Sequence, residues 1–224
     1  MLILTSFSIM NIQELLNKQN KMNGLDLLNI LEGGVKLAFF DPQYRGVLDK
    51  LGYGNESADN FKNKARVDLP AMDEATIKAF ISGINRVLCP SGHLMLWVDK
   101  FHLCEGIHHW IEGTDLQVVD MITWDKGRIG MGFRSRRRSE YVIVLQKKPK
   151  RVKGCWNVHN IPDVWLEKVK ATHTHSKPHL LQKALIEATT NEGDLILDPA
   201  SGGWSVLKAT LETGRNFIGS DLLG

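Results

Sequence analysis

The chain has 224 residues, 43% hydrophobic and 24% charged, and this globular composition excludes wholesale disorder and fibrous repeats. No uncharged apolar run approaches the roughly 20 residues that a membrane-spanning helix needs. The first 13 residues lack the basic residues and the cleavage site of a secretory signal peptide. The three cysteines are odd in number and widely spaced, which indicates a reducing, cytoplasmic location without a disulfide framework.

The net charge of +3 hides an uneven distribution along the chain. Residues 126–153 hold eleven Lys and Arg and one acid, a net charge of +10, whereas the remainder carries −7. Such a block is typical of proteins that bind a polyanion, and a solvated surface with scattered basic residues is the alternative. We predict a small basic recognition segment at about residues 126–176, with nucleic-acid contacts from Arg134, Arg136, Arg137, Arg138 and Lys147. In extended backbone, Arg136 and Arg138 share one face and Arg137 takes the other.

Short apolar runs alternate with helical patterns. The runs typical of strands are residues 36–40, 93–98, 118–124, 141–146, 195–198 and 216–221. The helical patterns are residues 73–88, 178–190 and 205–214. The segment Cys-Pro-Ser-Gly, residues 89–92, is expected to end the first helix, and residues 45–70 are expected to form a mobile loop. The alternation predicts a single α/β domain over residues 1–224, with a mostly parallel sheet.

The sequence Asp41-Pro42-Gln43-Tyr44 directly follows the first apolar run. Pro42 has a fixed φ and no N–H, so the chain must leave the sheet there. The Asp41 carboxylate and the Pro42 carbonyl are both hydrogen-bond acceptors, which together suit a ligand that presents two hydrogens, such as an exocyclic amine. Tyr44 offers a flat face for a base. A simple β-turn is the alternative interpretation.

A glycine-containing turn follows the strand that ends at Asp198. Gly202 and Gly203 allow a ligand to approach the backbone, and a helix that begins near Ser205 favours an anionic group at its N-terminus. The next strand ends in Asp221, an acid placed where ribose hydroxyls can be bound. This pattern favours a nucleotide-like cofactor, with an ordinary strand–turn–helix connection as the alternative. His173, His175 and His179 lack a partner at ligand spacing, so no metal site is predicted.

Four segments together resemble the amino-group DNA methyltransferases. DPQY (41–44) is similar to the DPPY motif of that family, and LILDPASGGWS (195–205) to its DPFxGSGT cofactor loop. NFIGSDL (216–222) is similar to the strand after that loop, and HSKPHLLQKALIEA (175–188) to the segment before it. The DPPY-like motif comes first and the cofactor loop last, which is the circularly permuted order of the β group. Gln43 replaces a proline, and the SGGWS sequence means that Trp204 needs room near the cofactor.

The resemblance implies a Rossmann-like methyltransferase, with helices on both faces of the sheet, that uses S-adenosylmethionine and no metal. Asp41 and the Pro42 carbonyl are expected to hold the amine of a flipped-out base, and Tyr44 to stack on it. After methyl transfer, the cofactor is expected to leave as S-adenosylhomocysteine. The cofactor-binding residues implied are Asn23, Gly24, Lys177, Pro178, Asp198, Pro199, Ala200, Gly202, Gly203, Ser205 and Asp221.

An Asp in the first motif position favours the N6 amine of adenine, in double-stranded DNA, as the methyl acceptor of a restriction-modification enzyme. Methylation of cytosine N4 or of RNA is an alternative within this class. A non-catalytic nucleic-acid-binding relative and a small-molecule methyltransferase are alternatives from other classes. The short recognition segment is also compatible with a homodimer, as is common in the family.

Overall fold

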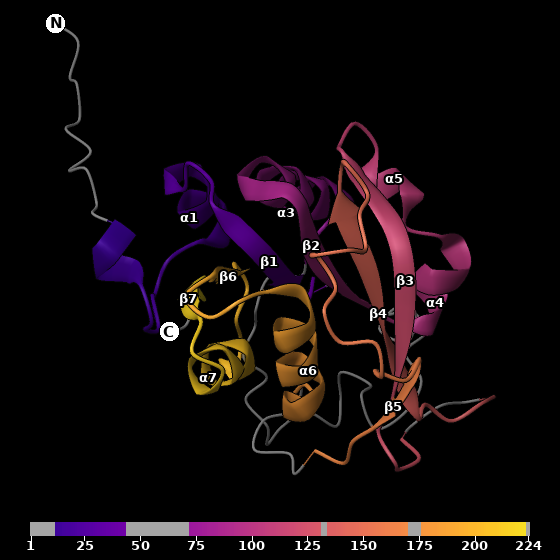
Figure 1. The fold of residues 1–224 in the computed structure, drawn as a ribbon. Coiled ribbons are helices and arrows are strands. Elements are labelled where there is room, and N and C mark those ends of the chain that lie inside the picture. The colour runs from indigo at the N-terminus through magenta and orange to yellow at the C-terminus, as the bar shows by residue number, and fades with distance from the viewer. Residues whose placement is uncertain (1–11, 44–71, 131–133, 170–175, 223–224) are drawn as a thin grey trace, which may run out of the picture.

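The computed structural model describes residues 12–43, 72–130, 134–169 and 176–222. Within these ranges, seven strands form one sheet in the order β5-β3-β4-β2-β1-β6-β7 (Figure 1). The strands are β1 (Val35–Phe40), β2 (Leu88–Val98), β3 (Leu116–Asp125), β4 (Ser139–Lys147), β5 (Val164–Leu166), β6 (Leu195–Asp198) and β7 (Asn216–Gly219). The helices are η1 (Ile12–Leu15), α1 (Gly24–Ile30), α3 (Glu74–Val87), α4 (Lys100–Glu105), α5 (His108–Ile111), α6 (His179–Thr189) and α7 (Ser205–Glu212). Tyr44 and the loop predicted at 45–70 lie outside the described residues.

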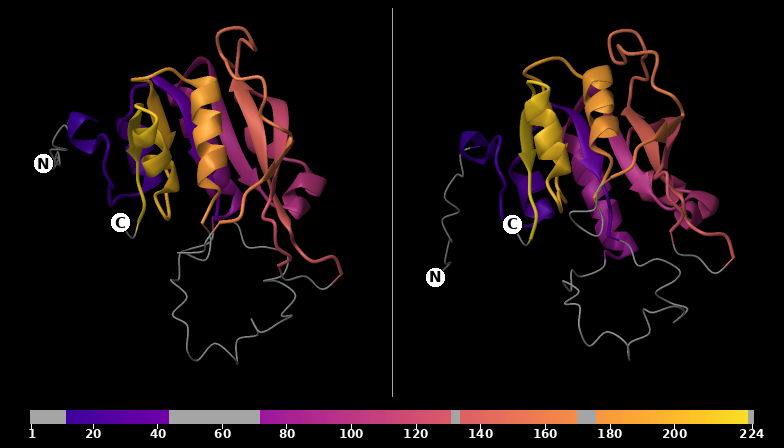
Figure 2. Two further views of the ribbon diagram at one scale, coloured as in Figure 1. Left: turned by 60° about the horizontal axis from the view of Figure 1, so that its bottom comes forward. Right: turned by 90° about the horizontal axis from the view of Figure 1, so that it is seen from below.

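The sheet is mostly parallel, as the alternation of strands and helices predicted. β2, β1, β6 and β7 run parallel to one another, and β5 runs parallel to β3. β4 is antiparallel to both of its neighbours, β2 and β3. Asp125 of β3 faces Ser139 of β4, so the two strands form a hairpin whose connection begins at residue 126. Because β4 starts where β2 ends, this connection lies at the carboxyl edge of the parallel strands (Figure 2).

Helices cover both faces of the sheet, which confirms the expected layered arrangement. α1 and α3 pack on one face, and α6 and α7 pack on the other (Figures 1 and 2). Successive side chains of β1 alternate between the two cores, since strand side chains point to opposite faces. Ala38 and Phe40 join the core under α3, where the rings of Phe40 and Phe80 stack at 5.1 Å, whereas Leu37 and Phe39 join the core under α6.

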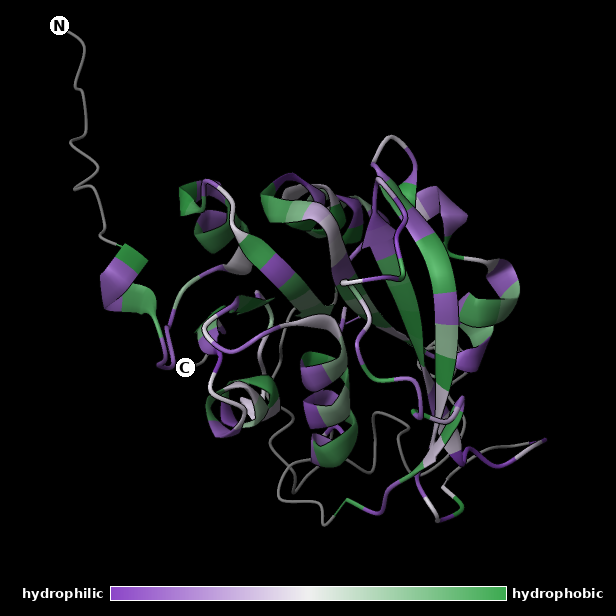
Figure 3. Cartoon of the chain, viewed as in Figure 1, coloured by the Kyte–Doolittle hydropathy of each residue, from purple (hydrophilic) through white to green (hydrophobic). Residues whose placement is uncertain are grey.

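Hydropathy follows the same layering. In Figure 3 the strands in the middle of the sheet are mostly hydrophobic, while α6 is hydrophobic on one side and hydrophilic on the other. The buried side of α6 carries Leu181, Leu185 and Ile186. None of the helices in the described ranges combines the length and the apolar character required to cross a bilayer.

The start of β2 departs from the prediction. The helix ends before residues 89–92, as expected, but the strand expected at 93–98 begins earlier, because β2 starts at Leu88 directly after α3. The parallel register passes from Leu88↔Val35 to His93↔Leu37, so the extra residues bulge from the strand, with Ser91 at φ 62°. A bulge tolerates Pro90, which cannot donate to a regular ladder. The three-residue strand β5 was not predicted, because its short run forms a strand only by pairing with β3.

Candidate active site

Three carboxylates meet at the carboxyl edge of the sheet. Asp41 follows β1, Asp198 ends the neighbouring strand β6, and Asp221 lies just beyond β7. Parallel neighbouring strands end at the same edge, which is where open α/β sheets bind ligands. Burial raises the pKa of the Asp198 carboxyl to about 8, and the negative charges of Asp41 and Asp221 act in the same direction. The edge is therefore suited to a cationic ligand.

The turn after β1 presents polar groups to this edge. Pro42 is buried, whereas 38% of the Asp41 side chain is exposed. The outgoing chain is fixed at Gln43, whose carbonyl accepts a hydrogen bond of 2.8 Å from the Met72 N–H. Tyr44, expected to stack on the base, lies outside the described residues.

The loop after β6 is held by hydrogen bonds on both sides. The Ala200 N–H donates to Asp198 Oδ1 (3.3 Å), and the Gly202 N–H donates to Asp221 Oδ2 (3.2 Å). Gly202 has φ 49°, a left-handed conformation that favours glycine, and a Cβ added there would have no neighbouring atom within 4 Å among the described residues. The loop residues Pro199, Ala200, Gly202 and Gly203 thus lead from Asp198 to the first residue of α7, Ser205.

The Trp204 side chain was expected to need room near a cofactor, but it does not occupy the loop after β6. Its backbone is left-handed, with φ 57°, and it directly precedes α7. The side chain is only 8% exposed and meets Phe217 edge-on, with 6.3 Å between ring centroids. Trp204 therefore packs in the core beneath α6 and α7, and the loop itself stays open.

The segment before α1 joins the same site from the far end of the chain. The Asp221 N–H donates to the Asn20 carbonyl (3.1 Å), and the Met22 N–H donates to the Asp221 carbonyl (3.2 Å). Asn23 caps α1 by accepting from the Leu25 N–H at 2.8 Å. A Cβ on Gly24 would lie 2.0 Å from the Pro199 carbonyl oxygen, so only glycine allows α1 to abut the loop.

Lys177 lies beside Asp41. Its ammonium is 2.9 Å from Asp41 Oδ2 and 2.9 Å from Glu140 Oε2, and it sits 4.8 Å from the centroid of the Trp97 ring. Pro178, the next residue, is the N-cap of α6. Reasoning from the sequence assigned no role to Glu140. The signal that could have drawn attention to it is its position as the one acid in a basic block.

The basic block is divided between opposite edges of the sheet. Arg134, Arg136 and Arg138 are exposed near the hairpin connection at the carboxyl edge, and Arg137 is half-buried, with its guanidinium 5.9 Å from the Phe101 ring centroid. The alternation of exposed Arg136 and Arg138 with half-buried Arg137 is the pattern that extended backbone gives. The Arg138 fork binds Asp125 through Nε–Oδ1 (2.7 Å) and Nη2–Oδ2 (2.8 Å).

Lys147, predicted to contact nucleic acid together with the four arginines, lies apart from them. It lies at the far end of β4, where its ammonium donates to the carbonyl oxygens of Asn85 (2.5 Å) and Leu88 (2.9 Å). These carbonyls belong to the end of α3 and to the residue that follows it, where helix carbonyls lack internal partners. Lys147 thus stabilises a helix end, and the structure separates it from the arginines.

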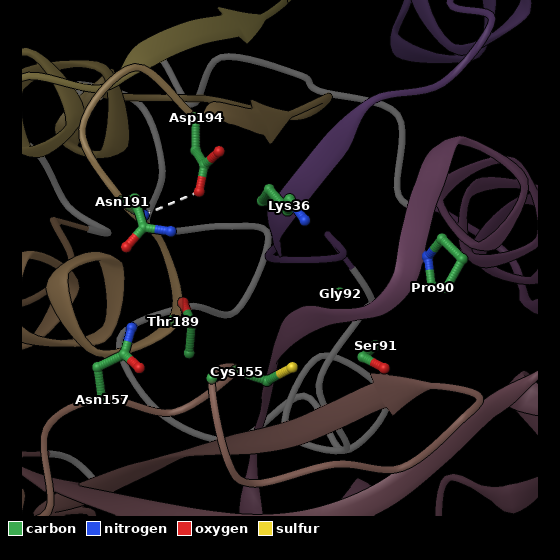
Figure 4. A pocket seen from close by; sticks show the side chains of 10 residues that line it. Lys36, Pro90, Ser91, Gly92, Cys155, Asn157, Thr189, Asn191 and Asp194 are labelled. Carbon is green, nitrogen blue, oxygen red and sulfur yellow. Dashed lines mark hydrogen bonds between the residues drawn. The ribbon is translucent and has the colours of Figure 1, made fainter.

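A small pocket lies at this opposite, amino edge (Figure 4). It is lined from several elements by side chains that include Lys36, Ser91, Cys155, Asn157, Thr189 and Asp194. In the described part of the chain, no group of three or more His, Cys, Asp or Glu is placed to hold a metal ion. Of the three histidines considered above, His179 pairs with Glu212 at 2.9 Å, and His173 and His175 lie outside the described residues.

Comparisons with known proteins identify relatives of this chain. The model of a family described as DNA methylase matches residues 35–223. The chain is 58% identical over 220 residues to the type II methyltransferase M.HhaII of Haemophilus parahaemolyticus, covering 97% of this chain and 96% of that protein.

Two solved structures share the fold. The M1.HpyAVI–SAM complex matches with a TM-score of 0.65 at 18% identity, over 91% of this chain and 92% of that one. The cytosine-N4-specific PvuII DNA methyltransferase matches with a TM-score of 0.68 at 14% identity, over 92% and 81%. The Rossmann-like α/β architecture is thereby confirmed.

Proposed function

The chain belongs to the DNA methylase family, and on that premise we propose that it methylates the N6 amine of a flipped-out adenine at specific sites in double-stranded DNA. The observation that supports this most directly is the position of Asp41. It lies at the end of β1, beside the glycine-containing loop that follows β6. One edge of the sheet thus combines an acceptor for an amine with a loop suited to a cofactor.

The described residues fit S-adenosylmethionine, which supplies a methyl group on a positively charged sulfur. The buried Asp198 carboxyl, with Asp41 and Asp221 near it, favours a ligand that brings positive charge. The open backbone at Gly202 leaves room for close approach, and the N-terminus of α7 favours a carboxylate. Asp221, whose Oδ2 accepts from the Gly202 N–H, is placed beside the loop where a ribose would lie.

Asp41 and Pro42 act on the acceptor amine. The lone pair of an exocyclic amine is delocalised into the base, so the nitrogen is a weak nucleophile in its planar form. Acceptance of its two hydrogens by the Asp41 carboxylate and the Pro42 carbonyl favours a pyramidal nitrogen. The same two acceptors stabilise the positive charge that grows on the nitrogen during methyl transfer.

The hairpin connection between β3 and β4 is proposed to hold the DNA. Arg134 and Arg136 are exposed there, at the same edge of the sheet as Asp41. A base within a duplex is out of reach, so it must be extruded at a cost of a few kcal/mol. Stacking on the Tyr44 ring, worth about 1–3 kcal/mol per base, would offset much of this cost.

Methyl transfer from labelled S-adenosylmethionine to unmethylated genomic DNA, followed by digestion to nucleosides, tests the proposal. Label in N6-methyldeoxyadenosine is expected, and Asp41→Ala serves as the inactive control. Label in N4-methyldeoxycytidine would show that the target base is cytosine and not adenine. Label found only in added RNA would overturn the proposal that DNA is the substrate. Cofactor binding without any transfer would indicate a non-catalytic relative.

The homodimer stays a prediction, which sedimentation velocity of the full chain tests.

A further inference from the structure

Glu140 is the one acid in the basic block, and it is half-buried. It lies in β4 with 28% of its side chain exposed, between two lysines. Its Oε1 pairs with Lys126, and its Oε2 lies 2.9 Å from Lys177 Nζ. Burial opposes ionisation of Glu140, but the two ammonium groups outweigh it and hold its pKa at about 2. The carboxylate is therefore charged throughout the neutral range.

The Lys177 ammonium is contacted from three sides. Glu140 and Asp41 each hold it at 2.9 Å, and the Trp97 ring lies beneath it at 4.8 Å. Only 14% of the lysine side chain is exposed. The Asp41 oxygen in this contact is Oδ2, and 38% of the Asp41 side chain is exposed. The position of the ammonium, and so of the Asp41 carboxylate, depends on where Glu140 holds it.

We propose that Glu140 is a positioning residue for methyl transfer: it holds Lys177 so that the Asp41 carboxylate faces the amine of the target base. The inference rests on the proposed function, because it concerns the orientation of the same acceptor. Glu140 touches neither the base nor the cofactor in this scheme and acts only through Lys177.

The charges support a role beyond packing. A lone ammonium beside Asp41 would cancel much of the negative potential that a developing cation on the amine nitrogen requires. Glu140 shares that ammonium and restores the balance, while Lys126 balances Glu140 on its other oxygen. Loss of the Glu140 charge leaves one uncompensated positive charge next to the reacting nitrogen.

The network also joins the hairpin to the acceptor. Glu140 follows Arg138 by two residues in β4, and Lys126 follows the last residue of β3. The two strands that lead to the exposed arginines are therefore tied, through Lys126, Glu140 and Lys177, to Asp41. A shift of the hairpin on binding DNA would therefore move the Asp41 carboxylate through these ion pairs.

The test compares single-turnover methylation of DNA, at saturating cofactor and DNA, by wild type, Glu140→Gln, Lys177→Met and the double variant. Glu140→Gln is expected to lower the rate constant on the order of 10- to 100-fold, as misplacement of a reacting group does. The dissociation constants of S-adenosylmethionine and DNA should stay within about 2-fold of wild type, since the affected step is the chemical one. The double variant should be no slower than Lys177→Met alone, because Glu140 acts through Lys177.

Glu212→Gln is the matched control, since Glu212 also pairs with two lysines, Lys183 and Lys208, and with His179, but its ion pairs include neither Asp41 nor Lys177. It should keep the wild-type rate. A wild-type rate in Glu140→Gln, or additive losses in the double variant, overturns the positioning role while the proposed function stands. If Glu140→Gln does not fold, a Lys177→Met variant with wild-type rate and cofactor affinity overturns it instead. A wild-type protein that transfers no methyl group to DNA removes the proposed function and this inference together.

Discussion

The two edges of the sheet use charged and polar side chains in different ways. At the carboxyl edge, the charged groups face one another: Asp41 and Glu140 share Lys177, and Asp198 is buried near other acids. At the amino edge, they mostly serve the backbone.

Lys147 binds two carbonyls at the end of α3. The Gln146 amide donates to the carbonyls of Ser91 and Arg151. Partly buried charges that pair with one another, at a cost in desolvation, indicate a site prepared for a ligand. Charges that hydrogen-bond to backbone carbonyls at a helix end indicate a structural role. The residue type alone does not separate these two uses.

Asp41→Ala should produce the largest change at the carboxyl edge. We expect the single-turnover rate to fall on the order of 100-fold or more, because a group that stabilises developing charge is lost. Calorimetry should show nearly unchanged affinity for S-adenosylmethionine. Turnover like that of wild type would remove Asp41 from the mechanism.

Lys147→Met, at the amino edge, should lower the free energy of unfolding without changing DNA affinity. Loss of the ammonium leaves two carbonyls near the end of α3 without their donor, at a cost of about 1–3 kcal/mol. Denaturant unfolding should show this loss, while DNA affinity measured by fluorescence anisotropy should not change. A variant that keeps its stability but loses DNA affinity would return Lys147 to the DNA-binding surface.

The raised pKa of Asp198 predicts a pH dependence of stability. Since this pKa rises from 3.8 to about 8 on folding, the folded state binds the proton more tightly between those values. The contribution to stability is therefore full below about pH 4 and is lost as the pH rises toward 8. Thermal unfolding of the cofactor-free protein at pH 5.5 and 8.5 should show a smaller decline for Asp198→Asn than for wild type. Equal declines would contradict the assignment.

Arg136→Ala and Arg137→Ala should separate an arginine that contacts DNA from an arginine that packs against the protein at the same edge of the sheet. Arg136 is exposed, so its loss should lower the magnitude of the log–log salt slope of DNA binding by about one unit. Arg137 packs near the Phe101 ring, so its loss should reduce stability with little change in that slope. Anisotropy titrations over a range of salt concentrations, together with thermal melts, measure both. Identical behaviour of the two variants would refute the division.

Local patterns in the sequence were enough for the strands and turns that build the site. The apolar runs before Asp41 and Asp198 each end in a turn set by a proline or by glycines, so β1 and β6 are confirmed nearly to the residue. The resemblance also assigned Asn23 and Gly24, near the start of the chain, and Asp221, near its end, to one cofactor site. The contacts of Asn20 and Met22 with Asp221 show that these two parts of the chain meet.

Only the tertiary structure decided where the charged residues of the basic block lie, because their positions depend on the direction and pairing of β4. Residues 126–153 form one block in the sequence, but an extended strand within it carries its two ends to opposite edges of the sheet. The arginines thus reach the carboxyl edge and Lys147 the end of α3. The same pairing brings Glu140 to Lys177, 37 residues away. Composition counts charges along the chain, whereas the partner of each charge is fixed by strand register, because register sets which side chains become neighbours.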